Sequence, residues 1–262
     1  MTLEDPKARA ALGLHLQSEY TASPEYDAQT PMQQSWRDFV YAEVWSRPGL
    51  ELRARFLISL AGAASICHTH ALNSYARGAL STGSLSLLEL REAALHVAVY
   101  CGWSSGSFMD SEITKAAEAL GIDPVETAPI RAEPWDPVER MESGAAAFLD
   151  TMTFGGPPVG NGNPFLQDGI LNFVFGEMWQ RDGLDQRSRR FLTLVGVANS
   201  TAETPIRSHF HAAMASGNCT PQELNEFVLQ YAIHAGWPKA SVIQGIVFEM
   251  AAKVAKGQPW NG

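Results

Sequence analysis

Histidine and tyrosine side chains that could transfer protons gather on a few segments of the chain. His68 and Tyr75 are seven residues apart, so they would share one face of a helix. His96 and Tyr100 would share a face of the following helix, and His209 lies late in the sequence. Imidazole and phenol groups can act as general acids or donate hydrogen bonds to a developing oxyanion. We therefore take His68, Tyr75, His96 and His209 as candidate catalytic residues.

Arginine residues recur in the pattern Arg-x-Arg at the start of two apolar segments. The pairs are Arg53 with Arg55 and Arg187 with Arg189. Such guanidinium groups either form ion pairs, with Glu43 and Glu177 as candidate partners, or bind an anionic substrate through their planar fork. Both alternatives stay open, and the four arginines are candidate substrate-binding residues.

Two apolar phrases that end in Gly-Trp show how these residues are arranged. "LHVAVYCGW" ends at Trp103 and "LQYAIHAGW" ends at Trp237, a separation of 134 positions. At the same offset, "FVYAEVWSRPGLELRARFLISLAGAA" from residue 39 aligns without a gap to "FVFGEMWQRDGLDQRSRRFLTLVGVA" from residue 173. Such self-similarity indicates two copies of one small domain. The two tryptophans are packing residues that could also wall a substrate pocket.

The domain organisation follows from this repeat. We predict a first domain over residues 1–120, a proline-rich connector over 121–135 and a second domain over 136–262. Apolar residues recur at helical spacing and no alternating strand pattern stands out, so the predicted fold class is all-α.

Particular residues set the helix boundaries. We expect helices near 51–64 and 68–81, the latter closed by Gly83. Capping boxes at Ser86 and Thr220, each with Glu three residues later, would open the helices that end at Gly102 and Gly236. The final helices of the two copies would span about 105–119 and 238–255.

Composition limits the classes of partner. The 262 residues carry a net charge of −9 and no cluster of Lys and Arg, which disfavours nucleic acid. No apolar run is long enough to span a membrane, and no signal-peptide pattern opens the chain. Three cysteines without Cys-x-x-Cys favour a reducing cytoplasm.

Two further chemistries remain as weaker alternatives. His68 and His70 could share a metal only outside a helix, because alternate residues of a helix point about 200° apart. Cys67 and Cys101 could be redox partners if they lay together, although buried free thiols are expected. We predict no metal and no cofactor.

Both copies resemble the carboxymuconolactone decarboxylase family. The resemblance rests on the Trp-x-Arg-x-Gly-Leu segments that begin at Trp45 and Trp179 and on the two Gly-Trp endings. It implies a small helical domain related to the thiol peroxidase alkylhydroperoxidase D, and a homo-oligomer, here a trimer of two-domain chains. It also implies a small-molecule anionic substrate of the ring-cleavage type met in aromatic catabolism.

The family's site residues are only partly present in this sequence. The decarboxylase pattern has Glu where this chain has Phe56 and Arg190, and it has His where this chain has Tyr75 and His209. The peroxidase thiols have no counterpart, because His68 and Ala71 stand there in the first copy and Ala202 and Pro205 in the second. The resemblance therefore implies a cofactor-free decarboxylase or a related lactone- or enol-handling enzyme. The alternatives are a catalytically silent binding or scaffold protein and a thiol-dependent peroxidase.

Overall fold

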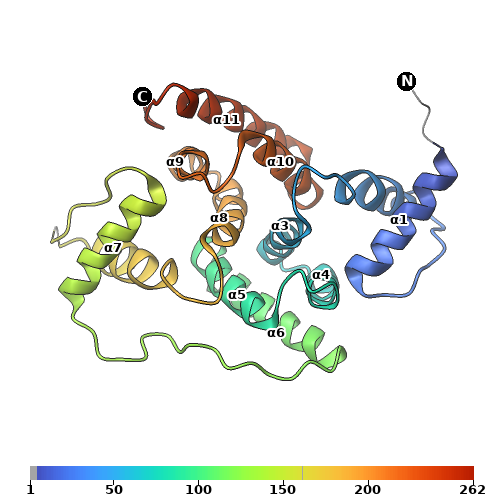
Figure 1. Ribbon diagram of the computed structural model, residues 1–262, viewed down its shortest axis with the longest axis horizontal. Coiled ribbons are helices and arrows are strands. Elements are labelled where there is room, and N and C mark those ends of the chain that lie inside the picture. Colours follow the sequence, from blue (N-terminus) through green and yellow to red (C-terminus); the bar gives the residue numbers. More distant parts are fainter. Residues whose placement is uncertain (1–4, 161) are drawn as a thin grey trace.

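Helices joined by loops form the fold in a computed structural model that describes residues 5–160 and 162–262 (Figure 1). These residues contain no strand, which confirms the all-α class. Residues 1–4, at the start of the predicted first domain, lie outside the described part. The helices of the first copy are α1 (Pro6–Thr21), α2 (Pro31–Ser35), η1 (Trp36–Trp45), α3 (Leu52–Ser65), α4 (Thr69–Ser81), α5 (Leu87–Cys101) and α6 (Trp103–Ala119). Those of the second are α7 (Pro137–Met152), η2 (Phe165–Met178), α8 (Gln186–Ser200), α9 (Glu203–Ala215), α10 (Pro221–Ala235) and α11 (Trp237–Ala255).

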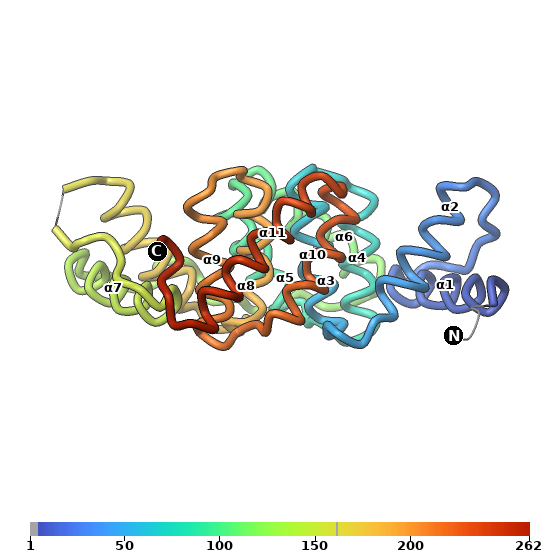
Figure 2. The backbone as a smooth tube through the Cα atoms, turned by 90° about the horizontal axis from the view of Figure 1, so that it is seen from above, coloured from blue at the N-terminus to red at the C-terminus, as the bar shows by residue number. Residues whose placement is uncertain are grey.

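The tandem repeat appears in three dimensions as two similar sets of helices. Figure 2 shows α1 and α7 at opposite ends of an elongated molecule, with α3, α5, α8 and α10 between them. The segments η1 and η2 are both wound as π-helices. Insertions of this wider winding often accompany functional sites.

Local sequence signals start and stop the helices as expected. The side chains of Ser86 and Thr220 each accept a hydrogen bond from the backbone N–H of the glutamate three residues later. The side chain of each glutamate in turn accepts one from the backbone N–H of Ser86 or Thr220. Gly102 and Gly236 have φ of 95° and 83°, a backbone conformation that disfavours other residues, and they end α5 and α10. One difference is that α6 and α11 begin directly at Trp103 and Trp237, so each tryptophan opens a new helix.

The two copies exchange their central helices. α5 of the first copy packs against α8 of the second, and α10 of the second packs against α3 of the first. Glycines permit both crossings, because a Cβ atom on Gly196 would lie 2.6 Å from Cβ of Tyr100 and one on Gly62 would lie 2.9 Å from Cβ of His234. One hydrophobic cluster accordingly runs through both copies. The predicted domain boundaries therefore describe the repeat in sequence, whereas the main core is built jointly.

Reciprocal ion pairs join the copies across the same contact. Arg47 and Arg55 bind Glu226 of the second copy at 2.6 Å and 3.1 Å. Their repeat counterparts Arg181 and Arg189 bind Glu92 of the first copy at 2.6 Å and 3.6 Å. Pairing matters here because an unpaired buried charge is costly.

The acid partners predicted for the Arg-x-Arg arginines were wrong. Glu43 pairs with Arg9, and Glu177 pairs with Arg140 and Arg181. The sequence suggested partners within one copy, whereas the exchange of α5 and α10 brings acids from the other copy to these helices. In the described residues, no helix has the length and apolar character needed to cross a membrane.

Candidate active site

Two cavities occupy equivalent places in the two copies. The second-copy cavity, of about 590 Å³, lies among α5, α7, η2, α8 and α9. The first-copy cavity, of about 670 Å³, lies among α1, α2, η1 and α4. Tyr75 of the first and His209 of the second are repeat counterparts, and so are Tyr41 and Phe175. The cavities are thus two versions of one site with different side chains.

His209 and Tyr100 face each other at the second-copy cavity. His209 comes from α9 and Tyr100 from the exchanged helix α5, and their ring centroids lie 5.5 Å apart at 87°. Burial, and then the charge of Arg190, lower the pKa of His209 to about 3, so the free site holds a neutral imidazole. Nδ1 of His209 is buried without a hydrogen-bond partner among the described residues. An unpaired buried polar atom marks a place where a ligand could bind.

A hydrogen-bonded chain supports Tyr100 from behind the cavity. Trp179 Nε1 donates to the Tyr100 hydroxyl at 2.8 Å, and Thr193 also lies within hydrogen-bonding reach of that hydroxyl. His96 Nε2 bonds Thr193 Oγ1 at 2.8 Å. Burial raises the pKa of Tyr100 to about 12, so its phenol remains protonated and can donate. This chain fixes the orientation of the phenol.

Arg190 supplies a positive charge beside the same cavity. Its side chain is fully buried, it donates to the carbonyl of Thr151 at 2.6 Å, and its guanidinium lies 5.0 Å from the ring centre of Trp179. No described carboxylate pairs with it, and burial lowers its pKa to about 10. A buried guanidinium without a carboxylate partner favours the arrival of an anion.

A His–Tyr pair also lies beside the first-copy cavity, with the two residue types in exchanged positions. Tyr75 of α4 meets His234 of α10 with ring centroids 5.5 Å apart at 88°. Burial raises the pKa of Tyr75 above its usual value and lowers that of His234 to about 4. Phe56 stands at the repeat position of Arg190, so this cavity lacks the buried guanidinium.

The structure divides the four predicted catalytic residues between the two cavities. His68 and Tyr75 line the first-copy cavity, and His209 lines the second-copy cavity. His96 lies behind the second-copy cavity, where its ring centre is 4.9 Å from that of Trp179. They therefore cannot act together on one substrate molecule.

The predicted substrate-binding residues lie mostly away from the cavities. Arg53, Arg55, Arg187 and Arg189 form ion pairs across the copies and line neither cavity. Trp103 is 61% exposed and lines the second-copy cavity. Trp237 is 57% exposed, packs against Phe39 and lines neither cavity.

Sequence reasoning overlooked Arg190, Thr193 and Trp179 as parts of the site. From the sequence, Arg190 was noted only as the residue that stands in place of the family's glutamate. Two features of the sequence could have indicated its role. Arg190 begins an apolar stretch, "RFLTLVGVA", and its repeat counterpart is Phe56. An arginine that replaces a core phenylalanine in one copy demands a reason beyond packing.

The three cysteines are free, and Cys67 and Cys101 are less buried than expected. Cys67, predicted to be buried, is exposed, because it occupies the positive-φ turn between α3 and α4. Cys101 is half-buried, and burial raises the pKa of its thiol to about 11. A thiol protonated at neutral pH is a poor nucleophile. In the part of the chain that the structure describes, no group of three or more His, Cys, Asp or Glu side chains could hold a metal ion.

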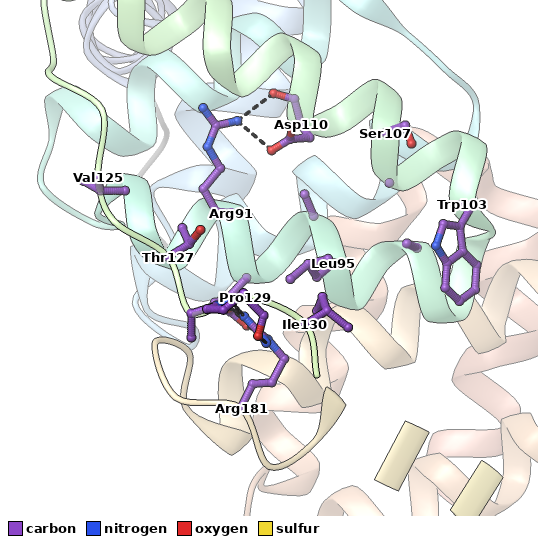
Figure 3. A pocket seen from close by; sticks show the side chains of 15 residues that line it. Arg91, Leu95, Trp103, Ser107, Asp110, Val125, Thr127, Pro129, Ile130 and Arg181 are labelled. Carbon is purple, nitrogen blue, oxygen red and sulfur yellow. Dashed lines mark hydrogen bonds and ion pairs between the residues drawn. The ribbon is translucent and has the colours of Figure 1, made fainter. Parts of the chain in front are cut away.

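A third cavity, of about 490 Å³, lies beneath the connector (Figure 3). Arg91 points towards Asp110 on one side, and Arg181 lies beneath connector residues Pro129 and Ile130 on the other. Arg181 also donates to the carbonyls of Ala128 and Pro129. Both arginines of this cavity thus already have partners, Asp110 for Arg91 and Glu92 for Arg181. We therefore assign no chemistry to this cavity.

These features define a helical protein with paired cavities built from duplicated domains. A model of the carboxymuconolactone decarboxylase family matches residues 30–106 and 164–245, more than half of the chain. The chain therefore belongs to the carboxymuconolactone decarboxylase family.

Individual relatives match over shorter stretches. The 4-carboxymuconolactone decarboxylase of Acinetobacter baylyi is 30% identical over 88 residues, which cover 34% of this chain and 65% of the relative. The nitrosuccinic acid decarboxylase of Metarhizium robertsii is 39% identical over 75 residues, 29% of this chain and 52% of the relative. An uncharacterised 15.0 kDa protein of Paracoccus denitrificans is 31% identical over 77 residues, 29% of this chain and 57% of the relative. The chain thus spans between about half and two thirds of the length of these relatives.

Proposed function

We propose that this protein is a cofactor-free carboxy-lyase of the carboxymuconolactone decarboxylase type. Its substrate would be a small anionic lactone or enol acid of the kind produced by aromatic ring cleavage. Two of the relatives are named decarboxylases, which supports the reaction class. The proposal includes a cytoplasmic location and a homotrimer of two-domain chains.

The observation that carries this proposal is Arg190, which is buried beside an apolar cavity and has no carboxylate partner among the described residues. Aromatic and aliphatic side chains form most of the second-copy cavity, and no aspartate or glutamate is among its described lining residues. An anion would thus meet one strong positive charge and little competing negative charge. Coulomb attraction of this kind is stronger in a poorly solvated site than in water.

The second-copy cavity can assist each step of a decarboxylation. Cleavage of the C–CO₂ bond leaves an electron pair that the lactone carbonyl group takes up, through the C=C bond of the ring, as an enolate. The Tyr100 hydroxyl would donate a hydrogen bond to the enolate oxygen, and the charge of Arg190 would lower its energy. His209 would then deliver a proton to the carbon next to the lactone carbonyl, so that the carbon that has lost CO₂ stays in the C=C bond of the enol-lactone. The remaining apolar walls favour departure of the uncharged CO₂.

Substrate binding would itself prepare His209 as the acid. In the free site, burial and the charge of Arg190 hold its pKa at about 3. A bound carboxylate would offset the charge of Arg190 and add an opposite charge near the imidazole, and both effects raise the pKa. The imidazole would accept a proton from water as the substrate binds.

The first experiment follows 4-carboxymuconolactone by proton NMR in deuterated buffer. We expect conversion to a decarboxylated enol-lactone that carries deuterium at the protonated carbon. His209→Asn should reduce the rate about 100-fold or more, and Tyr100→Phe about 10-fold or more, since such groups contribute these factors. His15→Asn, at an exposed histidine on α1, is the matched control.

If 4-carboxymuconolactone stays unchanged in this experiment, it is not a substrate of the protein. Equal rates for the native protein and the His209→Asn variant would contradict the assignment of the acid. Phe56 and Arg190 in place of the family's glutamate favour one alternative, a catalytically silent binding protein. That protein would bind the lactone without turnover and lose affinity in Arg190→Met.

A further inference from the structure

The first-copy cavity has a binding chemistry that the proposed lyase does not use. It is lined by residues of α1, α2, η1 and α4 and of the segment between α1 and α2, with Trp36, Tyr41 and Arg77 among them. Its volume of about 670 Å³ is within the range of small-molecule sites. His209 and Tyr100 line the other cavity, and Arg190 lies beside it, so any ligand here meets different groups.

Arg77 is the cation of this cavity. Its Nε atom is buried without a hydrogen-bond partner, and its guanidinium forms no ion pair with any residue that the structure describes. Among the described lining residues there is no aspartate or glutamate. The nearby surroundings therefore leave the charge of Arg77 available for an anion, and its planar fork suits a carboxylate.

His68 adds a second hydrogen-bond donor at the same wall. Its Nδ1 accepts a hydrogen bond from the backbone N–H of Ala71 at 3.3 Å, which caps the start of α4. An accepting Nδ1 places the proton of the neutral ring on Nε2. His68 therefore presents a donor, and His70 lines the cavity close by.

Aromatic side chains also line the first-copy cavity. The rings of Trp36 and Tyr41 lie 6.2 Å apart, and both line the cavity together with Tyr26 and Tyr75. Flat aromatic side chains favour a flat ligand, through offset stacking or edge-to-face contacts.

The two copies differ at this wall because their final segments run in different directions. His211, the repeat counterpart of Arg77, bonds the carbonyl of Gln258 through Nε2 at 2.8 Å. The segment after α11 folds back there, and Trp260 lines the second-copy cavity. The segment after α6 instead becomes the connector, which runs over α5 and α6 (Figure 1). Arg77 consequently has no equivalent backbone partner.

We propose that the first-copy cavity is a second ligand site, separate from the lyase site, that binds a small aromatic carboxylate. The carboxylate would lie between Arg77 and His68, and the ring would lie against Trp36 and Tyr41. This inference stands independently of the lyase proposal, because the two cavities share no lining residue.

Fluorine NMR of the full chain, labelled with 5-fluorotryptophan, tests the site with benzoate as the probe. Trp36 lines the first-copy cavity, whereas Trp103 and Trp260 line the second, so each cavity carries its own reporters. Trp36→Phe identifies the Trp36 resonance. We expect benzoate to shift that resonance with saturation, and benzyl alcohol, which lacks the charge, to bind at least about 10-fold more weakly.

Substitutions on α4 decide whether the cavity is responsible. Arg77→Gln should raise the Kd reported by Trp36 at least about 10-fold, and Arg77→Lys should raise it less. Ser74→Leu, which narrows the cavity from another position, should also weaken binding and remains informative if Arg77→Gln fails to fold. Arg207→Gln, at an ion-paired arginine on α9, is the control and should leave the Kd unchanged.

The outcomes separate this proposal from the lyase. A Trp36 resonance that benzoate does not shift, or an equal Kd in Arg77→Gln and the native protein, would overturn the second site. Turnover in Arg77→Gln should match that of the native protein if catalysis belongs to the second-copy cavity. If the protein shows no turnover but benzoate shifts the Trp36 resonance with saturation, the lyase proposal is contradicted and the second ligand site is supported.

Discussion

At the scale of single residues, Arg190 shows how a buried positive charge without a carboxylate partner among the described residues can indicate a candidate site. Its counterpart Phe56 fills the same position with an apolar ring that packs against Trp45 at 5.1 Å between ring centres. Arg190 lies against Trp179 in the same way but adds a buried charge. A buried charge is expected to cost stability, so we attribute its presence to the anion that we propose binds in the cavity.

Arg190→Met should therefore separate activity from stability. We expect the free energy of unfolding to stay equal or to rise, because methionine removes a buried charge and keeps much of the volume. kcat/KM for the lactone should fall by about 100-fold, which corresponds to about 3 kcal/mol of lost transition-state stabilisation. Urea denaturation and initial rates measure the two effects. A large loss of stability with unchanged turnover would give Arg190 a purely structural role.

Three histidines with a lowered pKa should make the protein acid-sensitive. Burial lowers the pKa of His96 well below its usual value, that of His209 to about 3 and that of His234 to about 4. In the unfolded chain each would titrate near its ordinary value of about 6.5. Below that pH the unfolded state binds more protons than the folded state, so stability is full above pH 6.5 and falls as the pH decreases.

Urea denaturation at pH 7 and pH 5 measures this loss. We expect about 1 kcal/mol per pH unit for each of these histidines below pH 6.5. The carboxylates with lowered pKa, such as Glu226 and Glu177, lose their contribution only below about pH 4.5. His234→Asn should reduce the pH dependence, and an identical dependence in that variant would contradict the assignment.

At the scale of helices, the crossing of α5 over α8 determines where Tyr100 lies. Gly196 is the closest point of that crossing, since an added Cβ would lie 2.6 Å from Cβ of Tyr100 and 3.0 Å from its backbone oxygen. The backbone atom cannot move aside as the end of a flexible side chain could. The site thus depends on a position where α8 has no side chain.

Gly196→Ala should move α5 away and displace the Tyr100 hydroxyl. We expect a loss of about 1–3 kcal/mol in the free energy of unfolding, as for other overpacked cores, together with reduced turnover. Gly245→Ala on α11 is the matched control, because an added Cβ there meets nothing within 4 Å. It should gain up to about 1 kcal/mol from helix propensity. Equal stabilities of the two variants would exclude the tight crossing.

At the scale of the whole molecule, each copy completes the site of the other. Tyr100 of the first copy faces His209 of the second, and His234 of the second faces Tyr75 of the first. The reciprocal ion pairs of Glu92 and Glu226 connect the same surfaces. The duplicated domains are therefore one folding unit with two internally exchanged helices.

Cutting the connector tests this interdependence. Residues 1–128 and 129–262, expressed together as separate chains, should associate one to one and recover the lyase activity. Each half expressed alone should be unfolded or pair with itself, because α3 or α8 would otherwise expose its buried face and an unpaired arginine. Light scattering and circular dichroism measure the result. A half that is both monomeric and folded would contradict the shared core.

The sequence by itself determined the all-helical class, the repeat, the capped starts of α5 and α10 and the family. Periodic apolar residues, capping boxes and terminal glycines act over a few neighbours, so they can be read directly from the chain. Of the predicted catalytic histidines, His68 and His209 line the two cavities and His96 lies behind one of them. Their chemical roles remain predictions.

Only the tertiary structure decided which residues share a cavity. The sequence placed His96 and Tyr100 in the first copy, yet they serve the cavity of the second, because α5 buries its apolar face against α8. The same exchange supplied Glu92 and Glu226 as partners of the Arg-x-Arg arginines and left Arg190 without one. Packing between segments far apart in the chain sets these contacts, and local sequence patterns carry no information about it.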